Sequence, residues 1–175
     1  MAIPLFFCLI SLNMVSAEEA RVIGISVEAI DNQAEGMARC KFCGRLIKIG
    51  EVRSDAVTIV DGQIKEELTQ RGFSCRQDND RKMQWHINVF IYRFEERIGG
   101  NYGVERPAKV SLHLHLYQEG VLKKTHCFEE EQRALSENVL KLGKFLKRGG
   151  KWVRAEVLSE EGIEKGLDIL LEEIE

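Results

Sequence analysis

Apolar and polar residues alternate along three stretches in the middle of the chain: 84–94, 109–117 and 121–128. In the second stretch, Leu112, Leu114 and Leu116 alternate with His113 and His115, so the leucines lie on one face of a strand and the histidines on the other. A short turn at 118–120 joins the last two stretches. The three stretches therefore predict an antiparallel meander.

Other segments repeat their apolar residues every three or four positions, as amphipathic helices do. This pattern predicts helices over 54–72, 135–146 and 163–174, whereas 22–30 and 73–76 have the composition of strands. Together these segments indicate an α+β fold with two layers, in which helices pack on one face of a mainly antiparallel sheet of four or five strands. We expect the face with the histidines to remain partly in contact with water.

The first seventeen residues form an apolar run from Ile3 to Ile10 that continues to Val15, Ser16 and Ala17. Small residues after an apolar core are typical of a secretion signal, which predicts cleavage after Ala17. The run is too short to span a bilayer, which needs about 20 apolar residues. We therefore expect a periplasmic or secreted protein of the bacterial envelope, with an uncleaved anchor or a mis-assigned start as the alternatives.

Residues 18–175 have the length of a single domain, which we expect to contain a long cysteine-bearing loop over 31–53. Charged residues make up 30% of the chain and hydrophobic residues 44%, as in an ordinary soluble globular protein. The net charge of −3 provides no general attraction to nucleic acid, so we expect no nucleic-acid partner.

Cys40 and Cys43 are separated by two residues and followed by Gly44. This spacing allows both sulfur atoms to bind one metal ion or to form a reversible disulfide. A zinc ribbon needs a second such pair, which the sequence lacks. In an oxidising compartment, the first expectation is structural disulfides among Cys40, Cys43, Cys75 and Cys127 with open connectivity. Metal binding and redox chemistry at Cys40 and Cys43 are the alternatives.

His113 and His115 leave the same face of their strand, and His126 on the next strand is close enough in sequence to approach them. Two such histidines suit a metal ion, but no Asp or Glu on this face completes a site. We therefore expect a polar sheet face and no cofactor. Zinc is the alternative, with Cys40 and Cys43 as one pair of candidate ligands and His113 and His115 as another.

Positive charges gather near the end of the chain, including Lys144, Lys147, Arg148 and Lys151. They form either a solvated helix face or a surface that contacts anionic lipid headgroups or an acidic partner. The sequence contains no nucleophile elbow, phosphate loop or dinucleotide fingerprint. We therefore assign no catalytic residue and expect the protein not to be an enzyme.

The segments EERIGGNY (95–102) and PAKVSLHLHL (107–116), with LSENVL, FLKRGG and WVRAE further on, resemble uncharacterised, lipoprotein-like proteins of the bacterial envelope. The resemblance implies a small α/β domain with an accessory or assembly role, as in proteins that assist polysaccharide export or cell-wall synthases. This chain departs from the lipoprotein pattern because bulky Phe7 precedes Cys8.

The leading functional hypothesis is therefore a non-enzymatic, secreted envelope protein that binds another protein or an envelope polymer. The alternative is a small redox or metal-binding protein that acts through Cys40 and Cys43.

Overall fold

The structure is a computed structural model that describes residues 21–31, 35–100, 104–131, 149 and 151–174. The predicted cleavage after Ala17, the helix expected over 135–146 and the cations Lys144, Lys147 and Arg148 lie outside these residues. Within them, no helix is both long enough and apolar enough to cross a bilayer.

The centre of the fold is a five-stranded sheet in the order β4-β1-β5-β8-β9. Its strands are β1 (Arg21–Ala29), β4 (Phe73–Gln77), β5 (Trp85–Glu95), β8 (Lys109–Gln118) and β9 (Val121–Glu131). Strands β5, β8 and β9 form the expected antiparallel meander, whereas β1 runs parallel to both of its neighbours. A small separate hairpin, β6 (Ile98–Gly99) and β7 (Val104–Arg106), lies between β5 and β8 in the chain.

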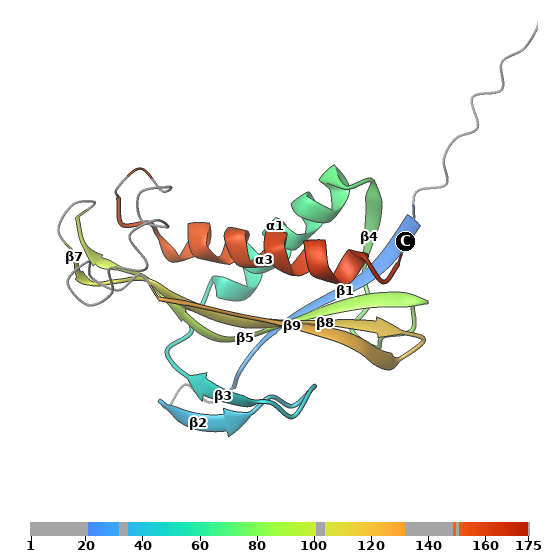
Figure 1. Cartoon of the computed structure of the whole chain (residues 1–175), viewed down its shortest axis with the longest axis horizontal. Coiled ribbons are helices and arrows are strands. Elements are labelled where there is room, and N and C mark those ends of the chain that lie inside the picture. Colours follow the sequence, from blue (N-terminus) through green and yellow to red (C-terminus); the bar gives the residue numbers. More distant parts are fainter. Residues whose placement is uncertain (1–20, 32–34, 101–103, 132–148, 150, 175) are drawn as a thin grey trace, which may run out of the picture.

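Helices α1 (Ala56–Gln70) and α3 (Ala155–Leu171) cover one face of this sheet (Figure 1). The apolar stripe of α1 is buried as its spacing predicts, and α3 buries its own stripe against β8 and β9. The aliphatic side chains of the strands complete this core. The α+β class with helices on one face of the sheet is thereby confirmed.

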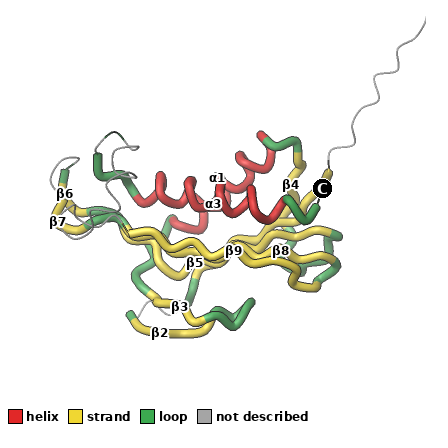
Figure 2. The backbone as a smooth tube through the Cα atoms, viewed as in Figure 1, coloured by secondary structure: helices red, strands yellow, loops and turns green. Residues whose placement is uncertain are grey.

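A second hairpin forms a third layer on the opposite face of the sheet (Figures 1 and 2). Its strands are β2 (Gly36–Arg39) and β3 (Leu46–Ile49), which pair antiparallel. The prediction of a long loop over 31–53 is therefore wrong for the residues of these two strands. Ile47 and Ile49 of the hairpin are buried in a separate apolar cluster with Phe90 and Tyr92 of β5. Burial of these alternating side chains stabilises strands that would be too short to persist alone.

Helix α3 lies close to the sheet because it carries glycine where it crosses β8 and β9. A Cβ atom at Gly162 would lie 2.6 Å from the Phe128 ring, and one at Gly166 would lie 2.7 Å from Leu114. Both distances are too short for real carbon contacts. The absent side chains thus allow the helix to pack directly on the strands.

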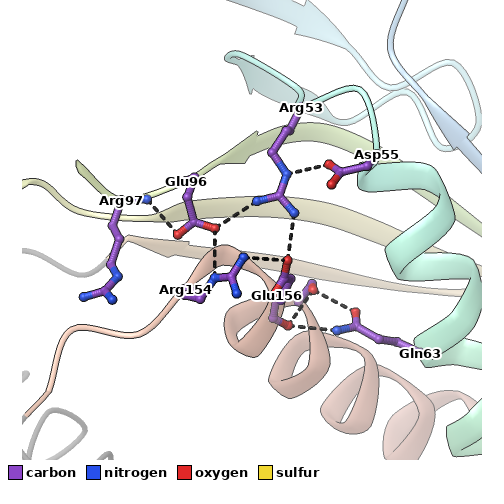
Figure 3. Close-up of polar contacts among 8 residues, drawn as sticks. Arg53, Asp55, Gln63, Glu96, Arg97, Arg154 and Glu156 are labelled. Carbon is purple, nitrogen blue, oxygen red and sulfur yellow. Dashed lines mark hydrogen bonds and ion pairs between the residues drawn. The ribbon is translucent and has the colours of Figure 1, made fainter. Parts of the chain in front are cut away.

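A cluster of charged residues ties together the starts of both helices and the end of β5 (Figure 3). The Arg53 guanidinium contacts the carboxylates of Asp55, Glu96 and Glu156, the last two at 2.9 Å. Arg154 also contacts Glu156, at 3.1 Å. Because cations and carboxylates pair with one another here, the cluster stabilises the junction of three elements, and we assign it no further role.

Candidate metal centre

The two cysteines of the Cys-X-X-Cys motif lie in the turn between β2 and β3. The backbone N–H of Cys40 donates to the carbonyl of Arg45, and that of Gly44 donates back to the carbonyl of Cys40, each at 2.8 Å. Gly44 has a φ of 72°, which favours glycine. The turn holds both thiols on the side of the hairpin that contacts the sheet: Cys40 is buried and Cys43 is half-buried.

The two histidines come from the middle of β8 and point toward this turn. His113 and His115 are two residues apart on a strand, so their rings leave the same face. Both are almost fully buried, with 1% and 0% of their surface exposed. The expectation of a wet histidine face was wrong, because the hairpin covers it.

The four side chains converge on one point. The Cys40 Sγ lies 3.5 Å from the His115 Nε2, and the Cys43 Sγ lies 3.6 Å from the His113 Nδ1. One ligand atom from each residue lies within 4.8 Å of every other. Two pairs of residues, some 70 positions apart in the chain, thus form one compact donor set.

These separations match the dimensions of a tetrahedral zinc site. Zinc binds thiolate sulfur at about 2.3 Å and imidazole nitrogen at about 2.0–2.1 Å, so a sulfur and a nitrogen on the same ion lie about 3.6 Å apart. The two sulfur–nitrogen distances in the structure, 3.5 and 3.6 Å, agree with this value. Two thiolates and two imidazoles are a standard ligand set for structural zinc.

Burial keeps both imidazoles neutral, which is the form that binds a metal. Desolvation lowers the pKa of His113 to about 4 and that of His115 to about 3. Desolvation also raises the pKa of the Cys43 thiol. Without a metal the Cys43 thiol is thus protonated at neutral pH, and metal binding would have to displace its proton.

The residues between the cysteines anchor the turn to the sheet. The Phe42 ring packs against Phe90 and against His115, with ring centres 5.3 and 5.2 Å apart. The Lys41 ammonium lies 2.7 Å from a carboxylate oxygen of Glu28, whose other oxygen accepts a hydrogen bond from the Asn88 amide. These contacts fix the turn above the histidines.

A second polar chain on the same face links Asp78, His86 and Ser26. The Ser26 hydroxyl lies 2.9 Å from the His86 Nε2, and the His86 Nδ1 lies 3.5 Å from the Asp78 carboxylate. The residue types are those of a hydrolase triad, but Ser26 is 3% exposed and its oxygen also accepts a hydrogen bond from Asn88. A nucleophile needs access to substrate, so we assign this chain a structural role.

The other cysteines and the third histidine considered from the sequence do not belong to this donor set. Cys75, Cys127 and the cysteines of the turn are free thiols, so the disulfides expected among them are not formed in the structure. Cys75 packs into the core on the helix side, whereas Cys127 pairs with His113 across β8 and β9 and accepts a hydrogen bond from Arg45. His126 lies on the face of β9 toward α3, so it does not approach the other histidines.

The arrangement suits a structural metal site. Four protein ligands would complete a tetrahedral shell around a bound ion, as in structural zinc sites. A metal bound here would join the hairpin to β8 and hold the third layer on the sheet.

We expect the metal-free protein to lose stability as the pH falls below about 6.5. An unfolded histidine takes up a proton near that pH, whereas His113 and His115 in the folded state do so only at about 4 and about 3. The unfolded state therefore binds more protons in this range. The expected loss is about 3 kcal/mol between pH 6.5 and 5 for the two groups together. Urea unfolding with chelator present, repeated at several pH values, measures it.

A His115→Gln variant provides the matched comparison for this pH dependence. It retains His113, and also His86 and His126, whose pKa values burial lowers as well, so more than half of the slope should remain. Equal slopes in the variant and the parent protein would contradict the assignment of the lowered pKa to His115.

Comparison with known proteins identifies the fold. No protein-family model and no curated protein matches the chain. Among solved structures, a point variant of the PelC dodecamer from Paraburkholderia phytofirmans matches with a TM-score of 0.52 and 11% identity over 86% of each chain. A second crystal form of PelC gives 0.49 and 10% over the same shares. A minor lipoprotein from Acinetobacter baumannii gives 0.30 and 11% over 83% of this chain and 86% of its own. The chain thus shares its fold with PelC.

Proposed function

We propose that this protein binds one zinc ion through Cys40, Cys43, His113 and His115, and that the ion fastens the β2–β3 hairpin to the sheet. The observation that carries the proposal is the convergence of four ligand atoms within 4.8 Å of one another. The neutral imidazoles and the sulfur–nitrogen distances support the choice of zinc. The proposal makes the protein a metal-stabilised binding module without catalytic activity.

The second part of the proposal is an accessory role in the bacterial envelope. The apolar run that ends at Ala17 and the resemblance to lipoprotein-like envelope proteins support it. The fold that the chain shares with PelC, which forms a dodecamer, is compatible with a role in an assembly. N-terminal sequencing of the protein from fractionated cells tests this cellular location. A start at Glu18 in the envelope fraction supports export, whereas an intact Met1 in the cytosol contradicts it.

Elemental analysis of the purified full chain tests the metal centre directly. We expect about one zinc ion per chain after removal of loosely bound metal. A Cys40→Ser substitution should reduce zinc to the background level, because it removes a buried thiolate ligand. A Cys75→Ser variant is the matched control, since that thiol lies on the other side of the sheet and its loss should leave the zinc content unchanged.

Thiol alkylation followed by intact-mass measurement separates zinc from a disulfide. In the zinc form, Cys40 and Cys43 become alkylated only after the metal is chelated, and no reductant is needed. A bond between these two cysteines in protein isolated from its native compartment would contradict the proposal, as would a parent protein with no more zinc than Cys40→Ser.

A further inference from the structure

The β2–β3 hairpin is strongly basic although the chain as a whole is acidic. Residues 36–49 contain four cations and no Asp or Glu, in a chain whose net charge is −3. The hairpin is also the outermost layer on its side of the molecule (Figure 1). Cations that the hairpin carries on its outward side are therefore displayed on the surface of the molecule.

The outward face of the hairpin combines apolar and cationic side chains. Met37 and Leu46 are 61% and 60% exposed, among the most exposed large apolar residues that the structure describes. Met37 pairs with Lys48 across the strands, and Arg39 pairs with Leu46. Each apolar side chain thus has a cation directly beside it, and all four residues are exposed.

The other two cations of the hairpin are held by the protein itself. Lys41 forms an ion pair with Glu28, and Arg45 donates a hydrogen bond to the Cys127 sulfur. Arg39 and Lys48 therefore provide the positive charge of the outward face, although one guanidinium nitrogen of Arg39 donates to the carbonyl of Gly44.

We propose that the outward face of the β2–β3 hairpin, formed by Met37, Arg39, Leu46 and Lys48, docks on an anionic lipid bilayer. A bilayer surface offers phosphate groups to the two cations. Just beneath these headgroups lies an apolar region that can accept the side chains of Met37 and Leu46. A soluble acidic polymer without apolar groups would match the cations but would leave Met37 and Leu46 in water.

The inference rests on the proposed metal centre for one property only, the rigid presentation of this face. The zinc ligands lie in the turn and on β8, whereas the four docking residues point away from them. Substitutions on the outward face should therefore leave the zinc content unchanged, and zinc measured on every variant separates a failure of docking from a failure of the metal centre.

Co-sedimentation of the full chain with vesicles tests the proposal. Phosphatidylglycerol–phosphatidylcholine vesicles should bind the protein at low salt, and pure phosphatidylcholine vesicles should bind it much less. Each neutralised cation should weaken binding about fivefold, so Arg39→Gln with Lys48→Gln should weaken it about 25-fold. Met37→Ser with Leu46→Ser should also weaken it severalfold. All variants keep the same N-terminus, so any contribution from that segment cancels.

Val121→Ser with Lys123→Gln is the matched control. Val121 is 60% exposed, as Leu46 is, and Lys123 is an exposed cation, but both lie on β9 and away from the hairpin. This variant should bind vesicles like the parent protein. Equal weakening by the control and the hairpin variants would overturn the proposal. Equal binding of the parent and the Met37→Ser, Leu46→Ser variant would also overturn it, because charge alone would then explain the attraction.

Discussion

Removal of the metal should lower the free energy of unfolding by about 4 kcal/mol, which is the stabilisation that a ligand gives when its free concentration is a thousandfold above its Kd. The proposed ion would bind the folded state only, because Cys40 and His115 are brought together by the fold over 75 positions of the chain. Urea unfolding followed by circular dichroism, with saturating zinc or with excess chelator, measures the difference.

The expected loss has a specific location. The hairpin has two four-residue strands and a small apolar cluster of its own, so the proposed metal ion would provide a large part of what holds it on the sheet. Hydrogen exchange after chelation should accelerate first in residues 36–49, whereas β5 and β8 should remain protected.

Two variants control this experiment. His113→Asn should resemble the chelated protein and should not respond to added zinc, because it lacks one ligand. Cys75→Ser should respond as the parent protein does. If chelation left both the urea midpoint and the exchange of residues 36–49 unchanged, the ion would have no structural role.

A Gly162→Leu substitution should destabilise the protein by about 2 kcal/mol, although leucine is a better helix former than glycine. The helix gains roughly 0.8 kcal/mol from the substitution. The new side chain, however, would begin 2.6 Å from the Phe128 ring, between α3 and β9. Overpacking of this kind costs typically 1–3 kcal/mol and occasionally more. This steric cost exceeds the gain in helix propensity, so the free energy of unfolding should fall. Thermal or urea unfolding measures the change.

Gly62→Leu is the matched control, because Gly62 also lies inside a helix. A Cβ atom at this position meets nothing within 4 Å. Only the gain in helix propensity remains, so this variant should be slightly more stable than the parent protein. A similar stability for both leucine variants would show that the contact between α3 and β9 is looser than the structure indicates.

The layers of the main sheet follow from local sequence patterns. Alternation predicts β5, β8 and β9, and the three-to-four spacing predicts α1 and the last helix, because these patterns reflect which face meets a core. The hairpin at 36–49 was not predicted. Two glycines and two cysteines interrupt its segment, and the alternation at Leu46–Ile49 extends over only four residues.

The sequence predicts the two ligand pairs of the proposed metal centre separately, but it does not predict that they come together. Each pair of ligands has the right internal spacing, but neither pair alone completes a shell. From the sequence, the histidine pair lacks an acidic residue on its own face to complete a site, whereas the fold provides two thiols from another layer. The position of these thiols depends on which face of the sheet the hairpin covers, and a single sequence gives no signal for that contact.

Strand β1 has a consequence for the order in which this chain can fold. It is the first described strand in the chain, yet it lies inside the sheet, between β4 and β5, and pairs parallel with both. During synthesis, β1 therefore has no partner strand until residues 73–77 of β4 have left the ribosome, and its second partner, β5, follows at residues 85–95. The meander forms from strands that lie later in the chain, so β1 pairs with β5 only through contacts distant in sequence. The sheet is therefore completed only after β8 and β9, the last of its strands in the chain, have been made.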